Sequence, residues 1–401
     1  MAIAPILSNR RVRVKLLPLR RNRERTSRCG IVTFTSHYLS REAKIVVEGI
    51  PKLRRVLVVG NMGYVGPVLV RHLRENREGL RIEGADTGYF AHCLTGPPEL
   101  PERLLDVQHF VDIRAVDDRL FQDVDAVVLL AAISNDPIGN RFEAVTRAIN
   151  VEASLRLARA AKARGASRLV FASSCSVYGA GSSAPCNEES PVLPLTAYAR
   201  SKVGLENELK ELADASFWVT CLRFGTACGF SDRLRLDLVL NDFVACALTT
   251  GKIVVLSDGT PWRPLIHVKD MSRAMEWGLV RKDGSNFLSI NAGSSQGNYQ
   301  VRELASAIAN VISGAEVSIN EAAQPDKRSY RVDFGRYETL AEGYAPQVSL
   351  HEAIEDLVRG LGRMKFADAN FRQSHLIRLH MLDDHIRSGR LTEQLEWAGT
   401  R

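Results

Sequence analysis

The chain has 401 residues, of which 45% are hydrophobic and 25% are charged, and its formal net charge is +7. This composition is ordinary for a globular protein, and no run of about 18 apolar residues predicts a membrane-spanning helix. The seven cysteines are odd in number and include no Cys-x-x-Cys pair. That pattern argues against a disulfide framework or a zinc site and favours a reduced, cytoplasmic protein.

The positive charge is concentrated at the N-terminus. Residues 1–29 hold nine Arg or Lys and one acid, a net +8, which leaves about −1 for the remainder. We expect residues 1–52 to form a disordered basic extension. The alternatives are a targeting segment, or an arm for nucleic acid or an anionic surface. A near-neutral remainder argues against nucleic-acid binding elsewhere in the chain.

The pattern of a dinucleotide-binding unit begins at residue 55. The apolar run RVLVVG predicts a strand, GNMGYVG a tight turn, and PVLVRHLRENRE a helix. In such a unit Gly60 permits the turn, Gly63 lets backbone N–H groups approach a pyrophosphate, and Gly66 allows close packing of the helix. Tyr64 and Val65 complete the turn at the helix N-terminus, where a phosphate charge is favoured.

Asp86 ends the next predicted strand, RIEGAD, 20 residues after Gly66. A carboxylate at this place accepts hydrogen bonds from the adenosine ribose and repels a 2′-phosphate, so the sequence predicts NAD rather than NADP as the cofactor. The alternative is an aspartate that merely caps a turn.

Strands and helices then alternate. FVDIRAV, DAVVLLAAIS, RLVFASS and FWVTCLRF read as further strands, and residues 140–164 and 196–213 read as helices. This order predicts an α/β fold, a Rossmann-type doubly wound parallel sheet over residues 53–230. Later segments are expected to return to it. We expect residues 231–365 to form a smaller substrate-binding lobe with helices at 302–313 and 350–364. Residues 366–401 are expected to be a helical appendage, helical over 370–397.

Tyr198 and Lys202 lie four residues apart in YARSK, on one face of the predicted helix. A buried ammonium beside the phenol is expected to lower the tyrosine pKa below its usual value of about 10. Ser174, at the end of RLVFASS, is a hydrogen-bonding partner for such a phenol. The sequence thus predicts proton transfer by Tyr198 near neutral pH.

In order along residues 54–345, these motifs resemble those of the extended short-chain dehydrogenase/reductase family, the NAD-dependent sugar-nucleotide epimerases and dehydratases. The motifs are GNMGYVG, Asp86, Asp112-Ile113, LLAAIS, INVEAS, FASSCSVYG, YARSK, LRFGTACG and WRPLIHVKD. The resemblance implies contacts with the cofactor from Asp112, Ile113, Ala131, Ala132 and Asn150. It also implies a homodimer formed through helices 140–164 and 196–213.

The resemblance also assigns the reacting groups. Ser174 and Tyr198 would flank the reacting sugar hydroxyl, and Lys202 would hold the nicotinamide ribose. Arg263 would bind the substrate diphosphate, and Arg328 is a second candidate, since the guanidinium fork bonds phosphate oxygens bidentately. Ser134 and Thr226 are further expected substrate contacts.

Departures from the family pattern narrow the expected chemistry. Cys175 and Ser176 stand where the 4,6-dehydratases carry Asp-Glu, and the decarboxylases also place a Glu at the second position. Both reactions are therefore disfavoured. Thr226 replaces a phosphate-contacting Asn of many 4-epimerases, and Gly225 replaces a bulky residue. We expect Cys175 to be a buried core thiol and His267 a structural strand residue, with no metal site.

The leading prediction is an NAD-dependent epimerase that acts on a nucleoside-diphosphate sugar at C4 and works through a transient keto sugar. One alternative is a sugar-nucleotide ketoreductase or dehydrogenase with net redox turnover. The alternative from another class is a non-catalytic nucleotide-sensing or RNA-associated scaffold.

Overall fold

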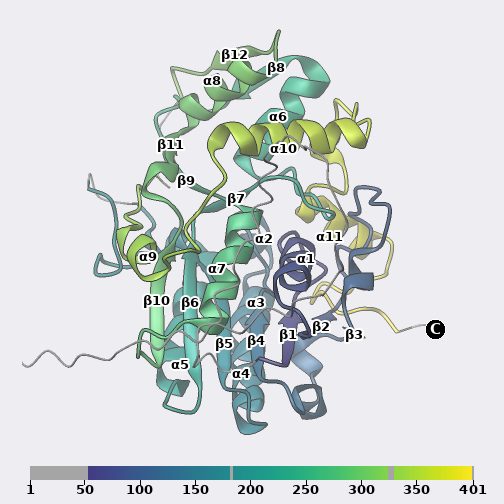
Figure 1. Cartoon of the computed structure of the whole chain (residues 1–401). Coiled ribbons are helices and arrows are strands. Elements are labelled where there is room, and N and C mark those ends of the chain that lie inside the picture. The colour runs from purple at the N-terminus through teal and green to yellow at the C-terminus, as the bar shows by residue number, and fades with distance from the viewer. Residues whose placement is uncertain (1–52, 181–183, 324–328, 400–401) are drawn as a thin grey trace, which may run out of the picture. The chain divides into compact units, whose positions relative to one another are not determined.

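The computed structural model describes residues 53–180, 184–323 and 329–399, which belong to the compact unit Gly49–Arg401. The predicted extension 1–52 and Arg328 lie outside these residues. The central feature is a seven-stranded parallel sheet with the order β10-β6-β5-β4-β1-β2-β3 (Figure 1). Its strands are β1 (Arg55–Val59), β2 (Arg81–Asp86), β3 (Val107–Phe110), β4 (Ala126–Leu129), β5 (Arg168–Ser174), β6 (Trp218–Phe224) and β10 (Phe287–Ala292).

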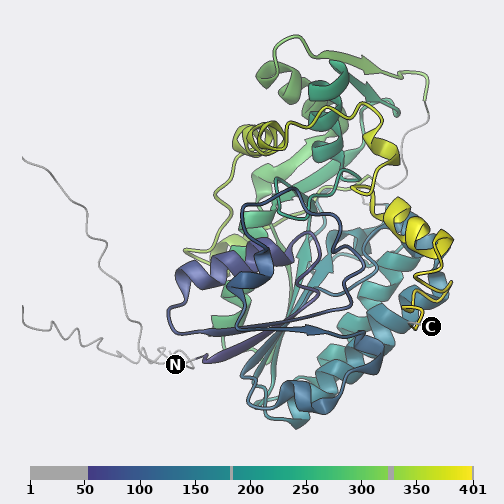
Figure 2. The same ribbon diagram turned by 90° about the vertical axis from the view of Figure 1, so that its right-hand side faces the viewer.

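Helices cover both faces of the sheet, as Figure 2 shows edge-on. One layer holds α1 (Gly66–Asn76) and α7 (Val268–Val280); the other holds α2 (Asp136–Arg141), α3 (Glu143–Arg147), α4 (Ser154–Ala163) and α5 (Ala197–Leu212). A π-helical turn, Ala148–Ala153, joins α3 to α4. Side chains alternate along a strand, so Val56 and Val58 pack with the first layer and Leu57 and Val59 with the second. The doubly wound Rossmann-type fold is confirmed.

A smaller lobe stands beyond the carboxyl ends of the strands. It contains α6 (Val239–Thr250), α8 (Val301–Val311), α10 (Leu350–Arg363) and two small sheets, whereas α9 (Gly335–Leu340) packs beside β10 of the main sheet. The sheets are β11-β9-β7 and β12-β8, built from β7 (Thr226–Cys228), β8 (Lys252–Val255), β9 (Trp262–His267), β11 (Asn298–Gln300) and β12 (Glu316–Ile319). The chain leaves this lobe at α7 and β10 to return to the main sheet, as expected.

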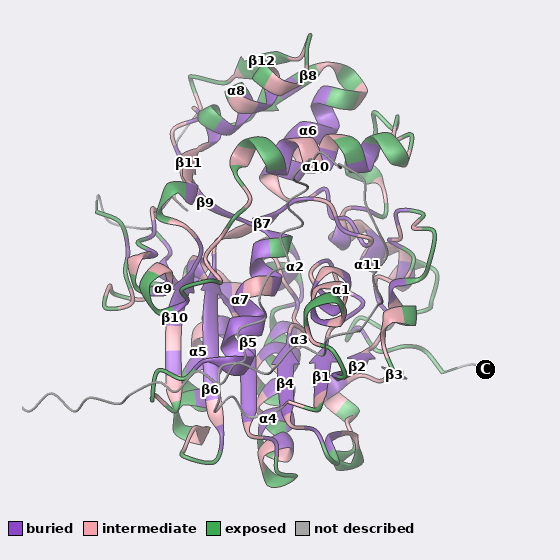
Figure 3. Cartoon of the chain, viewed as in Figure 1, coloured by how far each residue is buried: buried purple, intermediate pink, exposed green. Residues whose placement is uncertain are grey.

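The C-terminal segment differs from the predicted helix over residues 370–397. Only α11 (Arg378–Arg387) is an α-helix, and Leu391 and Trp397 then form an isolated bridge. Buried Leu382, Leu391 and Leu395 join the same core as α4 and α5 (Figure 3). The segment 370–397 is thus anchored by a few buried side chains, while many of its other residues are exposed. Within the described ranges, no helix combines the length and apolar character needed to cross a bilayer.

Candidate active site

A cavity of about 990 Å³ opens at the carboxyl ends of the parallel strands, between the sheet and the smaller lobe. Ligands of doubly wound sheets bind at this edge, and the volume is at the upper end of the roughly 300–1,000 Å³ typical of small-molecule sites. The predicted residues that line it are Gly60, Gly63, Tyr64, Val65, Gly66, Asp86, Asp112, Ile113, Ala131, Ala132, Ser134, Ser174, Tyr198, Lys202, Thr226 and Arg263. Residues from distant parts of the sequence thus share one chamber.

The glycine turn is built by close backbone packing. Gly60 has φ +91°, and a Cβ there would lie 2.4 Å from the Ala131 nitrogen after β4. A Cβ on Gly66 would lie 2.2 Å from the Asn61 carbonyl oxygen, so this glycine lets α1 start directly against the turn. The resulting cradle, with no acidic side chain in the first turn of α1, suits the pyrophosphate of a dinucleotide.

Two carboxylates lie at the next strand ends. Asp86 accepts hydrogen bonds from the Met62 N–H at 2.9 Å and the Gly88 N–H at 2.7 Å, and burial raises its pKa. Each oxygen still has a lone pair for a ribose hydroxyl. Asp112 is held by Arg114, whose Nη2 lies 2.5 Å from its Oδ2. These groups fit the adenosine half of NAD.

Asn150 is placed differently from the prediction. It does not line the cavity and is only 2% exposed. Its Oδ1 accepts from the Ile133 N–H at 2.8 Å, and its Nδ2 donates to the Ile133 carbonyl and to Ser201 Oγ. Its amide is consumed inside the protein. Asn150 positions the loop after β4 against α5 rather than facing a ligand.

Tyr198, Lys202 and Ser174 line the same cavity. Ser174 ends β5, where its Oγ accepts from the Ser176 N–H at 3.2 Å. Thr196 caps α5 by accepting from the Ala199 N–H at 3.1 Å, and the helix carries Tyr198 and Lys202 on its buried side. The Ser174 side chain lies close enough to Tyr198 to act on the pKa of its phenol. A strand end and a helix start therefore bring the three groups together.

The expected lowering of the Tyr198 pKa is wrong for this structure. Burial raises the pKa of Tyr198 to about 12, while the neighbouring Ser174 side chain acts in the lowering direction. Burial also lowers the pKa of Lys202 to about 7. The Lys202 Nζ donates to the Ala172 carbonyl at 2.7 Å and lies 4.6 Å from the centroid of the Phe171 ring. Desolvation thus outweighs the attraction that residue spacing alone suggested.

A buried ion pair links α5, the helix that carries Tyr198 and Lys202, to β6 of the main sheet. Glu206, one turn after Lys202, is bonded to Arg223 on β6, with the shortest N–O distance 2.6 Å. Their side chains are 4% and 9% exposed. The Glu206 charge also raises the Lys202 pKa, against the effect of burial. Sequence spacing gave no signal for this pair, because its members lie on different elements.

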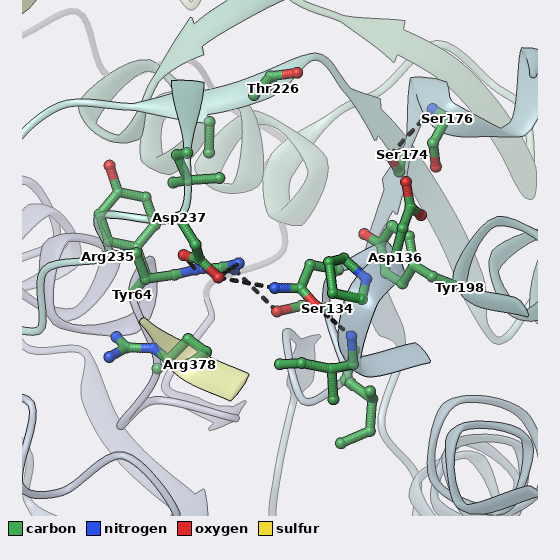
Figure 4. A pocket seen from close by; sticks show the side chains of 18 of the residues that line it. Tyr64, Ser134, Asp136, Ser174, Ser176, Tyr198, Thr226, Arg235, Asp237 and Arg378 are labelled. Atoms are coloured by element: carbon green, nitrogen blue, oxygen red, sulfur yellow. Dashed lines mark hydrogen bonds and ion pairs between the residues drawn. The ribbon is translucent and has the colours of Figure 1, made fainter. Parts of the chain in front are cut away.

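Several cavity residues were missed by the sequence analysis. Arg235 forms a two-point ion pair with Asp237, at 2.8 and 3.0 Å, and its Nη1 donates to Ser134 Oγ at 3.0 Å (Figure 4). Arg378 reaches the cavity wall from α11, far along the chain. Asp136 and Tyr330 also line the cavity and were missed. Burial raises the pKa of the Tyr330 phenol well above its ordinary value. Among these residues, only Arg235 and Asp237 lie in a segment with a recognisable local pattern, RLRLD at residues 233–237, in which charged residues alternate with leucines.

The remaining residues named from the sequence are placed as follows. Arg263 lines the cavity and donates to the Trp262 carbonyl, whereas Arg328 lies outside the described residues. A Cβ on Gly225 would lie 2.9 Å from the Pro264 carbonyl, so no bulky residue fits beside Thr226. Cys175 is fully buried, and burial raises its thiol pKa.

His267 is also structural, as expected. It is 3% exposed, its Nδ1 accepts from the Lys269 N–H, and its Nε2 lies 3.2 Å from Asp356.

The model of the NAD dependent epimerase/dehydratase family matches residues 56–293. The chain belongs to this family. It is accordingly an enzyme that uses NAD, in agreement with the glycine cradle and the carboxylates at the strand ends. The match covers β1 to β10, so it contains the whole main sheet.

The chain is similar to several named proteins and solved structures. The chain is 26% identical over 313 residues to the low-salt glycan biosynthesis protein Agl12 of Haloferax volcanii, covering 76% of this chain and 97% of that protein. It is 24% identical to UDP-glucose 4-epimerase of Lactobacillus helveticus, covering 76% and 94%. The solved structure of MoeE5 in complex with UDP-glucose and NAD is 26% identical, with a TM-score of 0.64, covering 77% and 99%.

Proposed function

We propose that this chain epimerises a nucleoside-diphosphate sugar at C4 through a transient keto sugar. The observation that carries the proposal is that Ser174, Tyr198 and Lys202 line the wall of a cavity that also holds the dinucleotide cradle. Relatives named UDP-glucose 4-epimerase support the substrate class. When bound, NAD supplies reversible hydride acceptance at a sugar carbon.

The chain's own residues would then manage the proton and the pose. Tyr198 takes the proton of the reacting hydroxyl and returns it, while Ser174 holds the same oxygen by a hydrogen bond. Because burial holds the Tyr198 pKa near 12, the phenol is protonated at neutral pH in this structure and suits the donating half-reaction. Arg263, on β9 across the cavity, is proposed to bind the diphosphate.

The two residues after Ser174 favour epimerisation over elimination, because neither is the acid that the 4,6-dehydratases use there. Cys175 is apolar in behaviour and faces the core, and Ser176 offers a hydroxyl instead of a carboxylate. A 4-ketoreductase or dehydrogenase would use the same Ser, Tyr and Lys. It differs from an epimerase in consuming or producing one reduced nicotinamide per turnover. The homodimer through residues 140–164 and 196–213 remains a prediction, to be tested by light scattering of the purified chain.

The test is incubation of the purified protein with UDP-glucose, UDP-galactose and further nucleoside-diphosphate hexoses. We expect inversion at C4 in at least one of them, detected by proton NMR, without net change in the absorbance of reduced nicotinamide. Tyr198→Phe should slow this inversion by at least about 100-fold, the usual contribution of a general acid–base group. A net change in reduced nicotinamide would support the oxidoreductase, and no inversion across the panel would refute the epimerase.

A further inference from the structure

A carboxylate that the sequence analysis did not single out lies at the catalytic tyrosine. Asp136 is the first residue of α2, and this short helix packs directly on the start of α5. A Cβ on Gly139 would lie 3.2 Å from the Tyr198 nitrogen and 3.3 Å from the Tyr198 Cβ. Glycine therefore allows the backbone of α2 to touch the residue that bears the phenol.

A hydrogen bond fixes the carboxylate in this position. Asp136 Oδ1 accepts from Thr196 Oγ1 at 2.7 Å, and the same threonine oxygen caps α5 by accepting from the Ala199 N–H. Thr196 therefore fixes the position of Asp136 relative to the start of α5, which carries Tyr198. The negative charge of Asp136 acts on the phenol, since it contributes to raising the pKa of Tyr198. It acts in the same direction on Tyr330, another cavity residue.

The carboxylate is directed at the reaction site. Figure 4 shows Asp136 at the same corner of the cavity as Ser174, Ser176 and Tyr198. The Ser176 Oγ, at the place where relatives carry an acid, is buried without a hydrogen-bond partner. The two residues after Ser174 carry no carboxylate, but α2 brings the carboxylate of Asp136 to the same corner of the cavity.

We propose that Asp136 is a further catalytic residue, which exchanges a proton with the substrate carbon next to the transient ketone. The inference rests on the proposed function, because that function generates the ketone. A C–H bond beside a ketone breaks heterolytically: the Asp136 carboxylate takes the proton, and the electron pair moves into the enolate. Return of a proton to the same carbon restores the ketone. Atoms and electrons balance without an added oxidant or reductant.

This step makes a prediction that hydride transfer alone does not. Inversion at C4 by hydride removal and return carries no solvent hydrogen into the sugar carbons. With Asp136 as proposed, turnover of UDP-glucose in deuterium oxide places one deuterium on a carbon next to C4, read by mass spectrometry and located by NMR. UDP-4-keto-6-deoxyglucose should exchange as well, and with this probe no hydride step is required.

The variant that isolates the carboxylate is Asp136→Asn, because the amide oxygen still accepts from Thr196. We expect it to reduce exchange by at least about 100-fold with an unchanged circular dichroism spectrum. The matched control is Asp118→Asn, at an exposed aspartate in the 3-10 turn Asp118–Phe121, which should leave exchange unchanged. If Asp136→Asn does not fold, Asp136→Ser also removes the carboxylate, with the circular dichroism spectrum again reporting the fold.

The possible outcomes separate this inference from the proposed function. Unlabelled sugar from both probes overturns the role of Asp136, even where C4 inverts. Exchange that survives in Asp136→Asn also overturns it. Exchange of the keto sugar without C4 inversion of any hexose supports Asp136 and refutes the 4-epimerase.

Discussion

The buried ion pair between Glu206 and Arg223 gives a sharp test of what holds the catalytic helix. The Glu206 carboxylate accepts from Arg223 Nε and Nη2, and also from the hydroxyls of Ser173 and Ser289. The change Glu206→Gln preserves shape but removes the charge. It leaves the guanidinium inside the protein without its carboxylate, which is the costly way to break such a pair.

The expected magnitude follows from this burial. Removing one partner of a buried pair costs about 3–5 kcal/mol of unfolding free energy, whereas replacing both is often close to neutral. Arg223→Met retains the apolar stem of the arginine. The double variant, Glu206→Gln with Arg223→Met, should therefore lose less than the two single variants together, by about 1–3 kcal/mol. Such coupling is the signature of a direct interaction.

Urea unfolding of the four proteins, followed by tryptophan fluorescence, measures these free energies. A loss below about 1 kcal/mol in Glu206→Gln would refute the reasoning, because it would place the pair in the range of exposed ion pairs. Strict additivity of the two single variants would refute it as well. An unchanged denaturant slope is the control that both states keep their usual exposed area.

Three further predictions test the site itself. Lys202 has its pKa lowered to about 7 from 10.5, so the unfolded chain binds more protons between these values and wild-type stability should rise with pH across that window. Lys202→Met should abolish this rise, and an unchanged slope of unfolding free energy against pH would contradict it. Gly66→Ala would put a methyl group 2.2 Å from the Asn61 carbonyl and should weaken NAD binding by at least about tenfold, measured by calorimetry. Trp397→Ala removes the indole N–H donated to the Thr87 carbonyl at 2.7 Å and should speed NAD release, whereas equal release rates would show that the C-terminal segment does not guard the site.

The C-terminal prediction rests on an arrangement beside the adenosine end of the cavity. The Tyr89 hydroxyl donates to the Leu395 carbonyl, and the Trp397 ring lies 5.9 Å from the Tyr89 ring. Arg114, which pairs with Asp112, also donates to the Leu395 carbonyl at 2.8 Å. These contacts join the segment around Leu395 and Trp397 to the loops that follow β2 and β3. Cofactor retention is therefore expected to depend on them.

The sequence by itself determined the parts of the protein that depend on local order. A strand, a glycine turn and a helix follow one another directly, so the positions of Gly60 and Asp86 at the cavity could be predicted. The alternation of apolar runs and helical periods likewise indicated a doubly wound sheet, because right-handed crossovers leave few topologies. Tyr198 and Lys202 share a helix face for the same local reason.

The tertiary structure alone decided which distant groups meet and how well they are desolvated. Asp136 lies beside Tyr198 because α2 packs on α5 through Gly139, a contact with no periodic signal. The Tyr198 pKa rises because burial, a property of the whole fold, outweighs its charged neighbours. Asn150 turned out to bind backbone and Ser201, since pairing within the chain consumed its amide. Residue spacing specifies faces and ends, whereas long-range packing sets the dielectric and the partners that govern reactivity.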